Sequence, residues 1–245
     1  VRRPTQVYVA WLNRGAQVRP FRLDRAAYEK ARASVESFWD ARLAAGAQIV
    51  VPEQRVDDAE RNLLIQNLEL SWRYSLGNSY ERFSWELPDV AEVMGDYGYR
   101  RIERAILGAA MHAHSYFPNR AAGERMAAVA HYYRRFLDRR YVNRVSQTFH
   151  RYLDAFQRQL DASPFSILGR ERYGADITQP IYGLHAQVLA LQGLKAMSTT
   201  WEQTGHPLLA DQAAQLAARL DAGLRQAVRL SEVQLSDGSL FVPIA

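Results

Sequence analysis

The sequence predicts an all-α protein built from helical hairpins. From residue 24 onward, apolar residues recur mostly at the three- and four-residue spacing of helices. Short turns rich in Gly, Asp and Pro separate these segments. Only the two ends of the chain have the pattern of strands. Because short links make neighbouring helices antiparallel, we expect about seven helices paired into hairpins, with a short extended segment at each end.

The first 23 residues are predicted to be an extended lead-in with a short strand at 6–11, where β-formers alternate. Asp24 is a good N-cap for a first helix, and Gly46 is a natural stop for it. A second helix is expected at 56–75, after a short extended connection. The apolar positions of the first helix are Ala27, Ala31, Val35, Phe38 and Leu43.

Turn residues divide the rest of the chain. Gly95 and Gly98 break a third helical region, Asp138 separates the next two helices, and a loop begins at Ser163. Asp237-Gly238 is typical of a hairpin turn that leads into a final strand. No linker of low complexity interrupts this part, so residues 24–245 are predicted to form one helical domain. The helices are expected at 88–114, 121–137, 139–161, 182–204 and 208–230.

Composition excludes several kinds of chemistry. The 245 residues contain no Cys, which excludes disulfides, thiolate nucleophiles and Cys-ligated zinc, but is silent on the cellular compartment. The formal net charge is +5, yet only Lys30 and Lys195 are lysines. Abundant Arg and Ala are typical of a GC-rich, bacterial-type coding sequence, so we interpret the arginines between Arg134 and Arg144 as a solvated face. Binding of nucleic acid by that face is the less favoured alternative.

No nucleotide-binding loop, zincin motif or nucleophile elbow occurs in the chain. The six histidines are scattered, and His112 and His114 point to different faces of a helix. The sequence therefore predicts no metal and no cofactor. No run approaches the roughly 20 apolar residues that cross a bilayer.

The segment Tyr80–Asp89 is the most informative one. It joins two predicted helices and holds three aromatic residues, one Arg and three carboxylates within ten positions. Aromatic faces cover the apolar side of a pyranose, and charged planar groups bind its hydroxyls. Cleavage of a glycosidic bond needs one protonated carboxyl group and a second carboxylate. Glu86 lies between Trp85 and Leu87, so burial would raise its pKa.

A structural interpretation of the same segment stays open. Phe83 and Trp85 would then fill the core, Glu86 would accept backbone N–H bonds, and Asp89 would cap the helix that follows Pro88.

The order of features resembles the six-hairpin glycosidases, which are (α/α)6-toroid enzymes. The matching elements are Phe38-Trp39 in the first helix, the Gly77–Tyr80 loop before Trp85-Glu86, and the turn at Asp96-Tyr97-Gly98. Later, Gly174-Ala175-Asp176 precedes Tyr182-Gly183-Leu184-His185 and a helix that ends at Thr204-Gly205. The resemblance covers most of residues 24–235 through short motifs.

The resemblance implies a carbohydrate-active domain that acts on an oligo- or polysaccharide by general acid/base catalysis. It implies Glu86 as the catalytic acid, with Asp89 as second choice. It also implies that Asp176 and His185 lie on a loop at the entrance of the same sugar-binding cleft. Tyr80, Arg82, Trp85, Asp176 and His185 would contact the carbohydrate.

The resemblance also implies that the chain is a partial domain. A full toroid has six hairpins, so the missing helices, with the partner carboxylate, would lie beyond Ala245 in a longer polypeptide. The alternative is a non-catalytic helical scaffold that binds a glycan or a protein partner.

Overall fold

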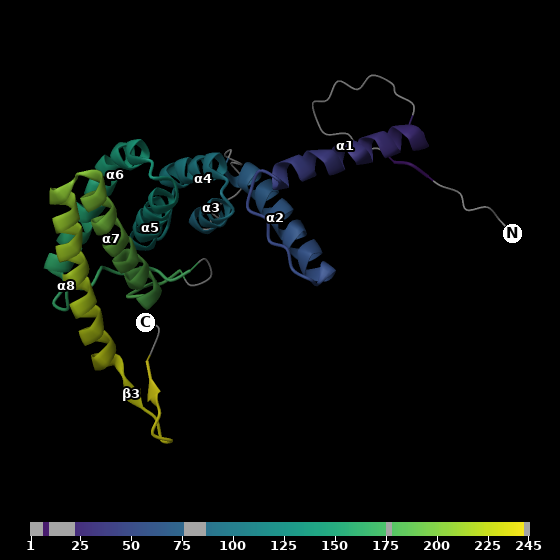
Figure 1. The fold of residues 1–245 in the computed structure, drawn as a ribbon. Coiled ribbons are helices and arrows are strands. Elements are labelled where there is room, and N and C mark those ends of the chain that lie inside the picture. The colour runs from purple at the N-terminus through teal and green to yellow at the C-terminus, as the bar shows by residue number, and fades with distance from the viewer. Residues whose placement is uncertain (1–6, 10–22, 76–86, 175–177, 243–245) are drawn as a thin grey trace. The chain divides into compact units, whose positions relative to one another are not determined.

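The computed structural model describes residues 7–9, 23–75, 87–174 and 178–242. These residues form helices α1 to α8 and two short antiparallel strand pairs, so the predicted all-α class is confirmed (Figure 1). The chain divides into two compact units, residues 1–65 and 66–245. None of the described helices combines the length and apolar character that are needed to cross a membrane.

The first unit contains α1 (Arg25–Leu43) and the start of α2 (Gln54–Ser75). The Asp24 side chain caps α1 as predicted, because its carboxylate accepts the Ala27 N–H at 3.0 Å. Arg61 of α2 pairs with Asp40 of α1. Among the predicted apolar positions of α1, only Leu43 is buried. Val35 is more than half exposed, and Phe38 is half exposed.

The second unit includes three antiparallel helical hairpins, besides the end of α2 and the two strand pairs. Gly98 and Gly205 end helices with a positive φ, the left-handed conformation that glycine adopts without strain. Asp138 caps α6 by accepting the Tyr141 N–H at 3.1 Å. The pairs are α3 (Leu87–Asp96) with α4 (Arg100–His112), α5 (Pro118–Phe136) with α6 (Arg139–Ala162), and α7 (Leu184–Thr204) with α8 (Pro207–Ser231).

Helices α3, α5 and α7 run in the same direction. The end of α3 contacts the second half of α5, since Asp96 Oδ1 lies 3.1 Å from His131 Nε2. Helices α5 and α7 meet where Gly123, in the second turn of α5, faces Gly193, in the third turn of α7. A Cβ at Gly123 would lie 2.4 Å from the backbone oxygen of Leu189, so the two helices approach each other through these glycines.

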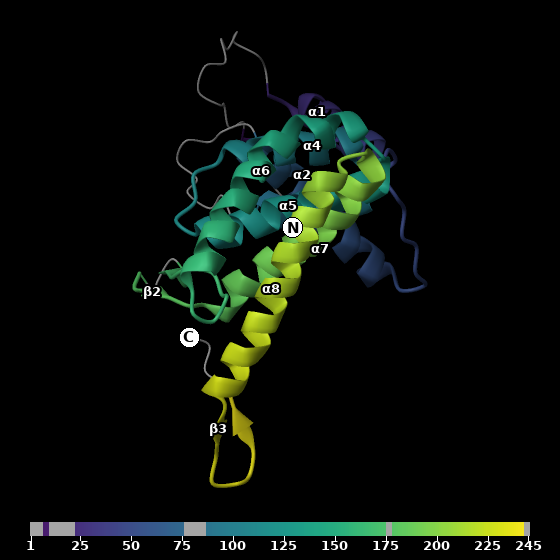
Figure 2. The same cartoon turned by 90° about the vertical axis from the view of Figure 1, so that its left-hand side faces the viewer.

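Helices α6 and α8 form a second parallel pair. His206 Nε2 lies 2.8 Å from Asn143 Oδ1 near the start of both helices, and Arg219 pairs with Asp161 further along. Trp201 of α7 is fully buried, and its indole N–H donates to Ser146 of α6 at 2.9 Å. Figure 2 shows α8 continuing into the terminal hairpin of β3 and β4. The largest fully buried side chains include Trp201, Tyr132, Phe149, Phe156 and Met94.

Several boundaries differ from the prediction. Helix α5 begins at Pro118, three residues before the predicted start at 121, because proline fits the first helical position. Strand β1 (Glu171–Arg172) pairs with β2 (Pro180–Ile181) inside the segment predicted to be a loop. Residues 7–9 are not in a strand. The predicted turn at Asp237-Gly238 is confirmed: it joins β3 (Val233–Gln234) to β4 (Leu240–Phe241).

Candidate functional site

The N-terminal ends of α3, α5 and α7 bring charged side chains together. Asp89 lies in the first turn of α3, where a carboxylate interacts favourably with the helix dipole. Arg120 Nε of α5 lies 2.6 Å from Glu124 Oε1 in a pair that is mostly buried. His185 is the second residue of α7. We call Asp89, Arg120, Glu124 and His185 the charged mouth.

Electrostatic coupling links the members of the charged mouth. Burial is the largest cause of the raised pKa of Glu124; Arg120 opposes it, and the charge of Asp89 raises the pKa further. Burial lowers the pKa of His185, Arg120 lowers it further, and Asp89 acts in the opposite direction. The mouth thus combines a carboxyl group that holds its proton more strongly than usual with a histidine that favours its neutral form.

Glu171 of β1 fixes the start of α5. Its carboxylate accepts the backbone N–H groups of Asn119 at 2.7 Å and Arg120 at 3.1 Å. The residue before the helix, Phe117, supplies no side-chain cap, so Glu171 takes that role from a distant part of the chain. Burial raises the pKa of Glu171, and the two N–H groups oppose the shift. This contact positions Arg120 in the mouth.

A hydrogen-bonded pair of side chains, Asn119 and Gln159, also holds the N-terminal end of α5 in place. Asn119 donates to Gln159 Oε1 at 3.0 Å, and Gln159 donates back to Asn119 Oδ1 at 2.8 Å. Gln159 also accepts the Gly169 N–H at 2.8 Å. The start of α5, the end of α6 and the segment before β1 are therefore held as one rigid base.

Exposed aromatic rings flank the charged mouth. The guanidinium carbon of Arg172 lies 5.2 Å from the ring centre of Tyr116, and that of Arg170 lies 4.9 Å from Tyr182. Both tyrosines are about half exposed. Such Arg–Tyr stacks hold the rings in fixed orientations at the surface.

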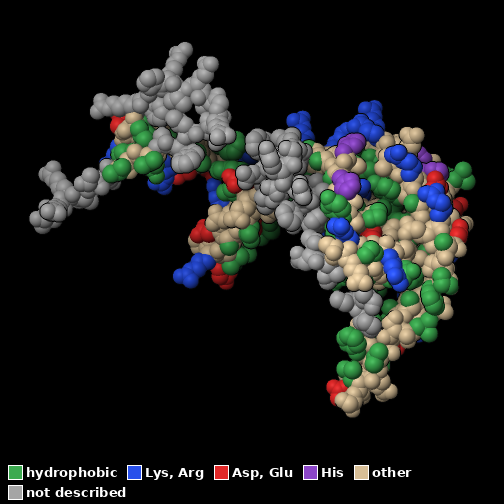
Figure 3. All heavy atoms as spheres, turned by 180° about the vertical axis from the view of Figure 1, so that it is seen from behind, with side chains coloured by type: hydrophobic (Ala, Val, Ile, Leu, Met, Phe, Trp, Pro, Cys, Tyr) green, Lys and Arg blue, Asp and Glu red, His purple; other side chains and the backbone are tan. Residues whose placement is uncertain are grey.

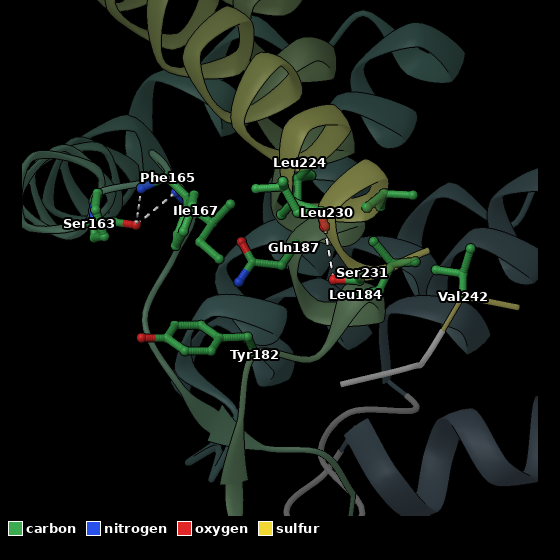
Figure 4. A pocket seen from close by; sticks show the side chains of 13 residues that line it. Ser163, Phe165, Ile167, Tyr182, Leu184, Gln187, Leu224, Leu230, Ser231 and Val242 are labelled. Atoms are coloured by element: carbon green, nitrogen blue, oxygen red, sulfur yellow. Dashed lines mark hydrogen bonds between the residues drawn. The ribbon is translucent and has the colours of Figure 1, made fainter. Parts of the chain in front are cut away.

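An apolar cavity of about 300 Å³, whose lining includes Tyr182, lies between the end of α6, the start of α7 and the end of α8 (Figure 4). Gln187 is its most polar group, but its amide bonds the backbone N–H and C=O of Leu168, each at 2.9 Å. Ser163 Oγ likewise accepts the N–H groups of Phe165 and Ile167. None of the described residues that line the cavity is a carboxylate, and this lining suits an apolar group.

A buried His–carboxylate group lies further along α3, α4 and α5. Glu103 is fully buried, and its Oε1 lies 3.5 Å from His131 Nδ1. Burial raises the pKa of Glu103, and Glu103 is the largest cause of the raised pKa of His131. Within the described ranges, no set of three or more His, Asp or Glu residues is arranged to hold a metal ion.

The structure brings two of the predicted site residues together, Asp89 and His185. Arg120 and Glu124 were not predicted from the sequence, although their four-residue spacing after Pro118 is typical of an ion pair near the start of a helix. The remaining predicted site residues lie outside the described part of the chain: Tyr80, Arg82, Trp85, Glu86 and Asp176.

No family model matches this chain, and neither does any curated protein or solved structure.

Proposed function

We propose that this chain is a carbohydrate-active helical domain that acts on an oligo- or polysaccharide at the charged mouth. One observation carries the proposal: three parallel helices present Asp89, Arg120, Glu124 and His185 at a shared end. These residues come from three separate helices, and Glu171 and Asn119 fix the central helix.

The carboxyl groups supply the chemistry in this proposal. Glu124, whose pKa burial raises, donates a proton to the leaving oxygen of a glycosidic bond. Asp89 is exposed and acts as the second carboxylate, which either activates water or attacks the sugar carbon. Glu86, three residues before Asp89, is the catalytic acid predicted from the sequence. It is therefore a second candidate for the role assigned to Glu124, and both residues are tested.

The other groups bind substrate in this proposal. Arg120 and neutral His185 offer hydrogen bonds to sugar hydroxyls. The rings of Tyr116 and Tyr182 offer flat apolar faces to a pyranose. The three hairpins of residues 66–245, with α3, α5 and α7 side by side, also support the proposed relation to an (α/α)6 toroid.

Release of reducing ends from soluble glucans, xylan and a polyuronate tests the proposal. The unaltered chain is expected to cleave one of these polymers. Asp89→Asn, Glu124→Gln and Glu86→Gln are each expected to lower kcat at least a hundredfold if their carboxyl groups transfer protons, because general acid–base catalysis contributes about 10²–10⁴-fold. Thermal unfolding of each variant checks that the fold is kept.

Glu202→Gln is the matched control, since Glu202 is an exposed carboxylate near the opposite end of α7. It should leave cleavage unchanged. Full activity in both Asp89→Asn and Glu124→Gln would contradict the assignment of the charged mouth. Calorimetric binding of a glycan without any reducing-end release would instead support the non-catalytic scaffold.

A further inference from the structure

Arginines gather at the other end of α5, far along the helix from the charged mouth. The N-terminal turns of α4 and α6 and the last turn of α5 meet there, and basic side chains line the upper edge of this unit in Figure 3. All but Arg104, which is half-buried, are exposed. The basic end comprises Arg100, Arg101, Arg104, Arg134, Arg135, Arg139, Arg140 and Arg144.

One buried carboxylate organises this surface. Asp138 Oδ2 lies 3.3 Å from both Arg100 and Arg104, and it accepts the Tyr132 hydroxyl at 3.1 Å. Asp96 pairs with Arg135. Eight arginines thus meet two paired carboxylates, whereas the whole chain has 31 basic and 26 acidic residues. The positive charge of the chain is concentrated at this end.

Five of these eight arginines form no ion pair with a described residue. Among the residues that the structure describes, no carboxylate oxygen lies within 4.0 Å of the guanidinium groups of Arg101, Arg134, Arg139, Arg140 and Arg144. Three of them occupy the first turns of α6, a 24-residue helix whose N-terminal N–H groups add positive potential. The surface is therefore ready to receive anions.

An apolar side chain projects from the middle of the basic end. Leu137 follows α5 and precedes Asp138, and 68% of its surface is exposed. Its φ is 51° and its ψ 33°, a left-handed conformation in which a leucine is strained and glycine is the usual residue. A turn that only faced solvent would require neither this strained backbone conformation nor an apolar side chain.

We propose that the basic end docks on an anionic membrane surface, with Leu137 entering the headgroup layer while Arg139, Arg140 and Arg144 bind lipid phosphates. Guanidinium groups bind phosphate in a bidentate manner, and an apolar residue among basic ones is typical of interfacial anchors. The proposal goes beyond the proposed function and does not depend on it.

The same features fit nucleic acid less well. Arginines alone suffice for a phosphate backbone, and an exposed leucine adds nothing to that contact. The tyrosines of this region, which would stack on unpaired bases, are buried: Tyr132, Tyr133 and Tyr141. A substitution of Leu137 should therefore weaken binding to a membrane but not binding to nucleic acid, and the experiment below includes such a variant.

Co-sedimentation of the full chain with vesicles tests the proposal. We expect binding to phosphatidylcholine vesicles that contain one quarter phosphatidylglycerol, and none to pure phosphatidylcholine. The triple variant Arg139→Gln/Arg140→Gln/Arg144→Gln should lower the partition coefficient about a hundredfold, at about fivefold for each arginine near a charged surface. Leu137→Gly should lower it about tenfold, because the apolar side chain no longer leaves water.

The matched control is Arg151→Gln/Arg158→Gln/Arg229→Gln, which removes the same charge from exposed positions outside the basic end. It should lower vesicle binding much less than the first triple variant. Absence of binding to the anionic vesicles, or an equal loss in both triple variants, would overturn the proposal. Tighter binding to duplex DNA than to vesicles, unchanged by Leu137→Gly, would assign the surface to nucleic acid instead.

Discussion

Single residues at helix ends set the geometry of this protein. Burial by itself would raise the pKa of Asp138, but hydrogen bonds from the Tyr141 N–H, the Tyr132 hydroxyl and Arg100 outweigh it and lower the pKa. This one carboxylate therefore joins the start of α4 and the end of α5 to the start of α6. The sequence predicted it as a turn residue, because Asp is common there, but not its arginine partners.

Leu137 is the position where local strain is most directly testable. Leu137→Gly is expected to raise the free energy of unfolding by up to about 1 kcal/mol, because glycine adopts a φ of 51° without a steric penalty. Chemical denaturation of the full chain measures the change. Leu137→Ala keeps a Cβ and hence the strain, so it should give no such gain; an equal gain in both variants would contradict the assigned cause.

Helix α5 is the central element of residues 66–245, and its contacts decide the direction of its neighbours. Asp96 of α3 pairs with His131, and Gly123 packs directly against the backbone of α7. The helical periodicity of α5 was readable from the sequence, whereas the importance of Gly123 was not. From sequence alone, a glycine inside a helical pattern predicts only a slightly less stable helix. Its role in packing is visible only when the neighbouring backbone is known.

Gly123→Ala is expected to lower the free energy of unfolding by about 3 kcal/mol, because the new Cβ would lie 2.4 Å from the Leu189 oxygen and would force the helices apart. Gly108→Ala in α4 is the matched control. Apart from its chain neighbours and its own helix backbone, no atom of the described residues lies within 4 Å of the new Cβ, so helix propensity should raise stability by about 1 kcal/mol. Urea denaturation of both variants separates packing from propensity, and similar values would contradict the close helix contact.

Across the whole molecule, buried acidic groups give stability an unusual dependence on pH. Burial is the largest cause of the raised pKa in four glutamates. In the unfolded chain these groups ionise near 4.5, so stability falls as the pH rises from there through their folded pKa values. The four are Glu92, Glu103, Glu124 and Glu171.

His131 also makes the folded protein less stable as the pH rises. Its folded pKa is raised, mainly by Glu103, so its contribution is complete below 6.5 and is lost as the pH rises through the folded pKa. The contribution of Asp138, whose pKa is lowered from 3.8, is lost in stronger acid. We therefore expect the highest Tm at about pH 5, with a fall toward pH 8.

Thermal unfolding followed by circular dichroism between acidic and mildly basic pH measures this profile. Glu103→Gln removes both the buried carboxyl group and the main cause of the His131 shift, so the decline toward basic pH should become shallower. Glu202→Gln, an exposed position, should keep the original profile. A Tm that rises steadily from pH 5 to pH 8 in the unaltered chain would contradict the assignment.

The division of the chain into two units was not readable from its residues, because the boundary after residue 65 falls inside α2 and no linker marks it. The sequence by itself determined the all-α class, the hairpin turns and most helix limits, since periodicity, caps such as Asp24 and stops such as Gly205 act within a few residues. Only the tertiary structure decided that Asp89, Glu124 and His185 share one end. The direction and rotation of packed helices depend on contacts between distant segments, which no local pattern records.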